Sequence, residues 1–237
     1  MEPAKRIGDQ FPDSRVFIVE DDPDSVESIR MYLKSAAIAY DVYQTGEAFL
    51  ENLDPIQPGC VLIDYRLSGM NGLEIQDELI RSASVLPVIV ISGFADVQVA
   101  VLAMRRGAIT LLQKPFTAQE LIQAVAEAFA VDLKNRDHLA RTSDAKTRLS
   151  TMTPEERIMI WALLDGRSNR SLADEEGVSL RTVERRRQRI FEKAQVESIV
   201  ELAELVKLAG WKRPGGQDPG RNGKDDSPDD PDRPKNR

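Results

Sequence analysis

Carboxylate, hydroxyl and amino side chains directly follow the apolar segments in the first half of the chain. They are Glu20, Asp21, Asp64, Ser92 and Lys114. Three carboxylates in one cleft repel one another and do not all ionise without a cation, and Mg²⁺ prefers such oxygens. A phosphoryl group transferred to Asp64 would need that cation, a lysine and a hydroxyl to balance the charge on its oxygens. The residue types therefore predict a magnesium-dependent site that accepts a phosphoryl group on Asp64, with Ser92 and Lys114 assisting.

These side chains meet only if the apolar segments form strands of one sheet. Five such segments alternate with five helical segments, which predicts a parallel sheet covered on both faces. The carboxyl ends of parallel strands meet at one edge, where ligands collect. A simpler interpretation, that Asp64 only caps the helix beginning near Asn71, explains one residue and not the others. The predicted strands are 16–19, 38–43, 60–63, 87–91 and 109–113, and the helices are 23–35, 47–52, 73–82, 97–106 and one from Ala118 onward.

Composition restricts the class of protein. With 237 residues and 41% hydrophobic residues, the chain has room for one large or two ordinary packed domains. No apolar run approaches the roughly 20 residues needed to cross a bilayer, and the first ten residues lack the apolar core of a signal peptide. We therefore expect a cytoplasmic protein that does not bind membranes. The single cysteine, Cys60, and single histidine, His138, argue against disulfides, cysteine-bound metals and a histidine base.

Residues 118–148 contain no glycine or proline, which predicts that the last helix of the first domain continues outward. Apolar positions become sparse beyond residue 130, so an exposed helix, a coiled-coil stalk and a flexible linker all fit the pattern. We assign 14–130 to the first domain and 131–148 to a helical linker. Residues 1–13 are expected to be a flexible N-terminus. Residues 212–237 are rich in proline, glycine and charge, and we expect disorder because they cannot bury enough apolar surface.

The second half of the chain, residues 149–211, predicts an all-helical domain of four helices. Thr153 and Pro154 are the hydroxyl cap and the first-turn proline of one helix. Gly177 lies in a tight turn between the next two helices. Two helices joined by a glycine-containing turn are the geometry of a helix-turn-helix. The last two predicted helices cover 180–194 and 198–209.

The predicted helix 180–194 carries five arginines between Arg181 and Arg189, although the net charge of the chain is −7. A local basic stripe matters more than the overall charge, because phosphate contacts act over a Debye length of about 8–10 Å. Val183 and Ile190 mark the buried side of this helix. Arginine and glutamine on the opposite side could read guanine and adenine edges or bind phosphates. The alternative is a solvated face whose arginines pair with nearby glutamates.

Four short motifs follow the predicted strands of the first domain: Glu20-Asp21-Asp22, the loop after Asp64, Ile91-Ser92-Gly93 and Lys114-Pro115-Phe116. Together they resemble the receiver domain of two-component response regulators. The resemblance implies a flavodoxin-like α/β fold with a five-stranded parallel sheet, and phosphorylation of Asp64 by a sensor histidine kinase. It also implies Mg²⁺ as the cofactor, held by Glu20, Asp21, Asp64 and the backbone carbonyl of Arg66. We expect Asp21 to bind the ion directly and Glu20 to bind it through water.

Two positions depart from the receiver pattern. The proline that is common four residues after the phosphorylated aspartate is Ser68 here, which we expect to loosen the loop without removing the chemistry. The aromatic residue usual three positions before the lysine is Leu111. The usual switch, in which that ring swings inward on activation, therefore lacks its ring. Coupling would then run through Ser92 and the helix 97–106, or activation is partly constitutive.

The second domain contains Thr153-Pro154-Glu155-Glu156, Gly177-Val178-Ser179 and Arg181-Thr182-Val183-Glu184. These motifs resemble the LuxR-type helix-turn-helix of FixJ/NarL-like response regulators. The resemblance covers 149–209 and implies an all-α four-helix domain that binds double-stranded DNA. A histidine is usual where Arg186 stands, which shifts the expected base preference and not the fold. The expected DNA contacts are Arg181, Thr182, Arg185, Arg186, Gln188 and Arg189.

These features predict a response regulator that a sensor histidine kinase phosphorylates and that regulates transcription as a DNA-bound homodimer. The receivers would pair through the 97–113 region, and half-sites about one helical turn apart would follow from two-fold symmetry. One alternative is a receiver that acts as a phosphate sink or protein-binding module. An enzyme with an aspartyl-phosphate intermediate is disfavoured, because such phosphatases need a carboxylate two residues after the nucleophile, where this chain has Arg66. We therefore expect no enzyme, only slow loss of the phosphoryl group.

Overall fold

The computed structural model describes residues 6–54, 56–93 and 97–213. The first five residues, and the part of the predicted disordered tail from residue 214 onward, lie outside the described residues. The chain divides into two compact units, one that reaches to Ala140 and one that begins at Arg141. Each unit has its own hydrophobic core, as a separately folded domain does.

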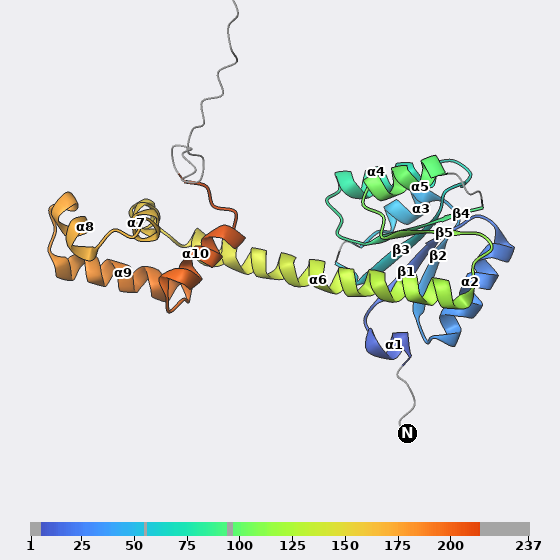
Figure 1. The fold of residues 1–237 in the computed structure, drawn as a ribbon, viewed down its shortest axis with the longest axis horizontal. Coiled ribbons are helices and arrows are strands. Elements are labelled where there is room, and N and C mark those ends of the chain that lie inside the picture. The colour runs from blue at the N-terminus through green and yellow to red at the C-terminus, as the bar shows by residue number, and fades with distance from the viewer. Residues whose placement is uncertain (1–5, 55, 94–96, 214–237) are drawn as a thin grey trace, which may run out of the picture. The chain divides into compact units, whose positions relative to one another are not determined.

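The first unit is built on a five-stranded parallel sheet with the strand order β2-β1-β3-β4-β5 (Figure 1). β3 is the central strand, and all of its residues are buried because helices cover both faces of the sheet. The continuous apolar runs of the sequence correspond to these strands. The strands are β1 (Arg15–Val19), β2 (Ala39–Tyr43), β3 (Gly59–Asp64), β4 (Val88–Ser92) and β5 (Thr110–Gln113).

Helices cover the two faces of this sheet (Figure 1). On one face, Ile29 and Phe129 are buried from α2 and α6. On the other face, Phe49 and Leu79 are buried from α3 and α4. The predicted flavodoxin-like α/β fold is therefore confirmed. The helices are α2 (Pro23–Ser35) and α6 (Ala118–Ser150) on the first face, and α3 (Gly46–Glu51), α4 (Gly72–Arg81) and α5 (Val97–Arg105) on the second.

The segment before β1 is packed against the first unit. It contains the short helix α1 (Ile7–Gln10), and the backbone amide of Gly8 donates to the carbonyl of Ala36 at 3.0 Å. The ring of Phe11 meets that of Phe129 edge-on, with 5.5 Å between centroids. These contacts differ from the flexible N-terminus that the sequence predicts, because Ile7 and Phe11 pack against the hydrophobic core of the first unit.

The part of α6 beyond residue 130 is anchored to the first unit by a buried carboxylate. Asp132 is 1% exposed and accepts a hydrogen bond from the backbone amide of Gly59 at 3.0 Å. It also pairs with Arg136 at 2.8 Å. The guanidinium of Arg136 in turn donates to the backbone carbonyls of Ile56 and Gln57. Residues that the sequence assigns to the linker thus satisfy backbone groups of the loop before β3.

The second unit is an all-α domain, as predicted. The end of α6 contributes Ala145 and Leu149 to its core. Gly177 ends α8 with φ 64°, a left-handed conformation that glycine adopts without cost, and the hydroxyl of Ser179 then caps α9. None of the helices formed by the described residues combines the length and apolar composition that a bilayer-spanning segment requires. The helices are α7 (Pro154–Leu164), α8 (Asn169–Glu176), α9 (Leu180–Ala194) and α10 (Ile199–Leu208).

One ion pair in the second unit is buried. Glu156 is 7% exposed, and its carboxylate accepts from Lys193 on α9 at 2.7 Å and from the backbone amide of Thr153 at 2.9 Å. Burial acts to raise the pKa of Glu156, but Lys193 and the Thr153 amide outweigh it, and the pKa lies below the ordinary value. The start of α7 is therefore joined to α9 by a carboxylate that is stable as an anion.

Replacement of Asp132 by alanine should destabilise the first unit by about 3 kcal/mol, because the Gly59 amide and Arg136 both lose a buried partner. Urea denaturation followed by tyrosine fluorescence measures this, since all four tyrosines lie between Tyr32 and Tyr65. The control is Lys134→Ala, an exposed position on the same helix. Equal stability of the two variants would contradict the anchoring role.

Replacement of Glu156 by glutamine should lower the free energy of unfolding of the second unit by about 2 kcal/mol at neutral pH. Because the folded pKa is lowered, the stabilisation is present above the ordinary value of 4.5 and is lost as the pH falls through the folded pKa. The difference between wild type and variant should therefore shrink in acid. Tryptophan fluorescence reports this unit, since Trp161 and Trp211 both belong to it. The exposed Glu204→Gln change should show no such pH dependence.

Candidate functional site

Polar residues from four strands meet at the carboxyl edge of the sheet. Glu20 directly follows β1, Asp64 and Ser92 end β3 and β4, and Lys114 directly follows β5. Neighbouring strands pair in parallel along their length, so these ends lie at one edge. Glu20, Asp64 and Ser92 are buried and Lys114 is half-buried. The fold therefore brings together side chains that are as much as 94 positions apart in the sequence.

The ammonium group of Lys114 lies between two buried carboxylates. Its Nζ donates to Glu20 Oε2 at 2.6 Å and to Asp64 Oδ2 through a short hydrogen bond. Burial acts to lower the pKa of Lys114, but its hydrogen bonds to Asp64 and Glu20 outweigh that effect and raise the pKa. Asp64 Oδ1 accepts from the backbone amide of Arg66 at 2.7 Å. Lys114 is thus held as a cation at the point where added negative charge on Asp64 would need one.

Glu20 is the most deeply buried acid of this group, with 1% of its surface exposed. Burial raises its pKa and the charge of Asp64 raises it further, while Lys114 and the hydroxyl of Ser25 at 2.8 Å lower it, and the pKa remains above the ordinary value. The loss of hydration on burial therefore outweighs the stabilisation that Lys114 and Ser25 give to the charged form of Glu20. Ser25 is not among the residues predicted from the sequence, because only the first turn of α2 brings its hydroxyl back to Glu20.

The next acid, Asp21, is directed to a different partner. Its Oδ2 accepts hydrogen bonds from the hydroxyl of Ser68 at 2.6 Å and from the backbone amide of Ser68 at 3.0 Å. The Ser68 hydroxyl is the main reason that the pKa of Asp21 lies below its ordinary value. Asp22, in contrast, caps α2 by accepting from the amides of Asp24 and Ser25.

The residues predicted to bind Mg²⁺ fit that ion by chemistry but are not gathered around one point. Within the described part of the chain, no three aspartate, glutamate, histidine or cysteine side chains are grouped closely enough to hold a metal ion. Glu20 and Asp64 meet Lys114, while Asp21 meets Ser68. The three acids nevertheless offer hard oxygens and bring three negative charges against one ammonium group. By donor chemistry, though not by their present arrangement, these acids suit a divalent cation.

Asp64 does not cap the helix that follows it. The cap of α4 is Asn71, whose side chain accepts from the backbone amides of Leu73 and Glu74. Gly72 lets the start of this helix approach the end of β3, since a Cβ atom at that position would lie 2.7 Å from the backbone oxygen of Asp64. The interpretation of Asp64 as a capping residue is therefore wrong, and its carboxylate remains available at the sheet edge.

In the second unit, α9 presents a buried apolar side and an exposed basic side. Val183 and Ile190 are 1% and 0% exposed and lie in the core. Arg181, Arg185 and Arg189 are exposed on the remaining surface of the helix. A positive surface on the second helix of a helix-turn-helix suits the phosphates and base edges of a DNA groove. The sequence-predicted stripe is thus present on one helix.

Some polar residues of α9 already have partners within the unit. Arg186 forms an ion pair with Glu176 of α8, and Gln188 donates to Glu192 at 2.9 Å. Arg187 is half-buried and lies over the ring of Phe191, with 5.2 Å to the centroid. Thr182 belongs to the cap at the start of the helix, where its hydroxyl is 2.8 Å from that of Ser179. The residues predicted to contact DNA therefore differ, because some of them must first break a hydrogen bond or ion pair within the unit.

Comparisons with known proteins place both units in families. Residues 16–126 match the response regulator receiver domain, and residues 150–206 match the bacterial regulatory proteins of the luxR family. The transcriptional regulatory protein FixJ of Azorhizobium caulinodans is 34% identical over 201 residues, which cover 84% of this chain and 95% of that protein. FixJ of Bradyrhizobium diazoefficiens is 31% identical over 195 residues, covering 82% and 95%.

The chain belongs to the FixJ/NarL-type response regulators. It is therefore a DNA-binding two-component response regulator. Among solved structures, response regulator StyR is similar with a TM-score of 0.75 and 31% identity, over 82% of this chain and 98% of that chain. Full-length FixJ from B. japonicum is similar with a TM-score of 0.51 and 31% identity, over 83% and 97%.

This response regulator has Leu111 on β5 at the position where the receiver pattern has an aromatic ring. The side chain is partly buried and packs against the core between the sheet and α3, α4 and α5. A cavity of about 390 Å³ lies along residues 111–116, which include Lys114. Ser92, the other predicted switch residue, is 2% exposed, and its backbone carbonyl accepts from the amide of Lys114 at 2.8 Å.

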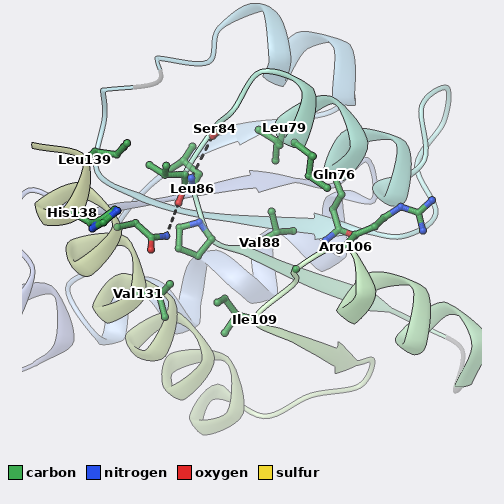
Figure 2. A pocket seen from close by; sticks show the side chains of 15 residues that line it. Gln76, Leu79, Ser84, Leu86, Val88, Arg106, Ile109, Val131, His138 and Leu139 are labelled. Atoms are coloured by element: carbon green, nitrogen blue, oxygen red, sulfur yellow. Dashed lines mark hydrogen bonds between the residues drawn. The ribbon is translucent and has the colours of Figure 1, made fainter. Parts of the chain in front are cut away.

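A second cavity of the response regulator, of about 370 Å³, lies at the other end of the sheet (Figure 2). Leu79, Val88 and Val131 form part of its apolar lining, and the side chain of Asn135 donates to the backbone carbonyl of Val85 at 3.1 Å beside it. Its lining contains Val88, the first residue of β4, whereas Asp64 pairs with Ile91 near the other end of that strand. None of the predicted site residues lines this cavity, so it is separate from the phosphoryl chemistry.

Proposed function

We propose that this response regulator receives a phosphoryl group on Asp64 from the phosphohistidine of a sensor kinase in the cytoplasm. A carboxylate oxygen of Asp64 forms the new bond to phosphorus, the phosphorus–nitrogen bond of the donor breaks, and the imidazole leaves with the electron pair and takes up a proton. The observation that carries the proposal is the buried Asp64 carboxylate hydrogen-bonded to the Lys114 ammonium at the sheet edge. The chain acts here as an acceptor and is not itself an enzyme for a second substrate.

In this proposal Lys114 and Ser92 balance the charge that arrives with the phosphoryl group. Lys114 is already held as a cation by Asp64 and Glu20. On phosphorylation its ammonium would turn from the carboxylate to a phosphoryl oxygen, and the hydroxyl of Ser92 would donate to another. Ser92 and Leu111 would then carry the change to α5.

Mg²⁺ would be held by Asp21, Asp64 and the backbone carbonyl of Arg66, with Glu20 binding through water. When bound, the ion supplies positive charge that stabilises the phosphoryl oxygens. The support is the excess of negative charge at this edge, where burial of Glu20 raises its pKa even with Lys114 at 2.6 Å. The match of residues 16–126 to the receiver domain leads to the same expectation of Mg²⁺ binding.

Dimerisation on phosphorylation would use the 97–113 region. α5 exposes four large apolar side chains within two and a half turns, which favours association with another apolar surface. They are Val97, Val101, Leu102 and Met104, with 74%, 44%, 40% and 50% of their surface exposed. A second receiver would cover this face, and two second units would then meet a two-fold DNA site with half-sites about one helical turn apart.

DNA would contact the exposed side of α9. Arg181, Arg185 and Arg189 would reach phosphates or guanine edges directly, with Thr182 at the start of the helix. Arg186 and Gln188 would have to exchange Glu176 and Glu192 for DNA. That exchange costs little, because exposed ion pairs are weak. The luxR-family match along residues 150–206 favours DNA over a protein partner for this face.

Incubation with acetyl phosphate and Mg²⁺ should phosphorylate the wild-type protein and leave Asp64→Asn unlabelled, because the asparagine amide is not a phosphoryl acceptor. Mass spectrometry of the intact protein measures the label. The matched control, Asp13→Asn, removes an exposed aspartate of the same unit and should label normally. Labelling of Asp64→Asn to the wild-type level would overturn the assignment of the acceptor.

Replacement of Arg185 by alanine should weaken binding to DNA selected by the wild-type protein about tenfold or more, and should reduce the salt slope of binding by about 1 if the contact is to a phosphate. Fluorescence anisotropy at several salt concentrations measures both quantities. Lys207→Ala removes the same charge from an exposed position on α10 and should change neither. An equal loss in both variants would show that only net charge matters.

A further inference from the structure

Ser68 does not simply loosen the loop between β3 and α4, as the sequence predicts, but ties it to the end of β1 through Asp21. The two residues are 47 positions apart, and a single oxygen, Asp21 Oδ2, accepts from both the hydroxyl and the backbone amide of Ser68, at 2.6 and 3.0 Å. These are hydrogen bonds to an anion and therefore stronger than neutral ones. A proline, which is usual at this position of the receiver pattern, has neither an N–H nor an O–H and could form neither bond.

This contact keeps a proposed metal ligand away from its partners. Glu20 and Asp64 both meet the ammonium of Lys114, whereas the carboxylate of Asp21 is held by the loop. Within the described residues the three acids form no group able to hold an ion. Asp21 is half-buried and Ser68 is exposed, so Asp21 can move without opening the core.

We propose that Ser68 is a latch on the metal site: it holds Asp21 on the β3–α4 loop, and Mg²⁺ binds only by drawing Asp21 out of both hydrogen bonds. The proposal rests on the Mg²⁺ site proposed above. Ser68 is a positioning residue, because it acts through Asp21 and touches neither ion nor phosphoryl group. Its effect is to weaken Mg²⁺ binding and to link metal occupancy to the freedom of the loop that follows Asp64.

The effect of the latch on Mg²⁺ binding should depend on how many hydrogen bonds residue 68 can donate to Asp21. Ser68→Ala removes the hydroxyl donor and keeps the amide, while Ser68→Pro removes both donors. Ser68→Thr keeps both. Because each charge-assisted hydrogen bond that metal binding must break opposes that binding, the dissociation constant for Mg²⁺ should fall about tenfold in Ser68→Ala and further in Ser68→Pro. Ser68→Thr should bind Mg²⁺ like the wild type.

Isothermal titration of the full-length proteins with magnesium chloride measures these constants without any phosphoryl donor. Hydrogen exchange of the 65–70 segment supplies a second readout, since the Ser68 amide is bonded to Asp21 only while the latch is closed. Mg²⁺ should accelerate exchange of this segment in the wild type, and should do so at a lower Mg²⁺ concentration in Ser68→Ala, which keeps the hydrogen bond of the amide to Asp21. That comparison does not depend on Ser68→Pro folding normally.

The outcomes separate the latch from the site on which it rests. Tighter Mg²⁺ binding in Ser68→Ala with wild-type binding in Ser68→Thr supports the latch. Equal constants in all proteins overturn the latch and leave the metal site standing. Weaker binding in Ser68→Ala also overturns it, since Ser68 would then orient Asp21 for the ion. Absence of Mg²⁺ binding in every protein overturns both the metal site and the latch.

Discussion

Two buried carboxylates that share one ammonium group are the constraint on which the first unit depends. Glu20 and Asp64 can be buried only because Lys114 lies between them, and an unpaired charge at that depth would cost several kcal/mol, by rough estimate. The parallel register of the strands is what brings three such distant residues to one point. With Asp21 this edge of the sheet carries three carboxylates and one ammonium group, so Lys114 alone does not balance the charge. This excess of negative charge favours the binding of a cation, and of an anionic group that binds together with a cation.

The architecture could be predicted from the sequence because its signals are local. Apolar runs mark the strands, and caps such as Asn71 and Thr153 mark helix starts within a few residues. The end of each strand could be predicted in the same way, which is why the acids and Lys114 fall where expected. What could not be predicted are contacts between distant loops. The hydrogen bonds of Asp21 with Ser68 join residues 47 positions apart, and no local pattern indicates which donor a half-buried carboxylate will accept from.

In the second unit, the local charge of one helix is opposite in sign to the net charge of the whole chain. With a net charge of −7 the whole protein is acidic, yet Arg181, Arg185 and Arg189 lie exposed on one helix. Glu176 of α8 partly neutralises the stripe through its ion pair with Arg186. The exposed positive charge of α9 is therefore limited to one side of the helix. Such an arrangement suits an elongated polyanion better than a diffuse acidic surface. The sequence indicates the arginines and nearby glutamates as possible partners, and the packing of α8 against α9 decides that Arg186 pairs with Glu176.

The hydrogen bonds of Asp132 bear on how this protein can be divided. A fragment cut at the end of the receiver match, near residue 126, would remove both Asp132 and Arg136. The amide of Gly59 and the carbonyls of the loop before β3 would then face solvent or remain unpaired. Truncations meant to isolate the receiver should therefore retain α6 to about Ala140, where the first compact unit ends. Shorter pieces would underestimate how stable this half is within the intact chain.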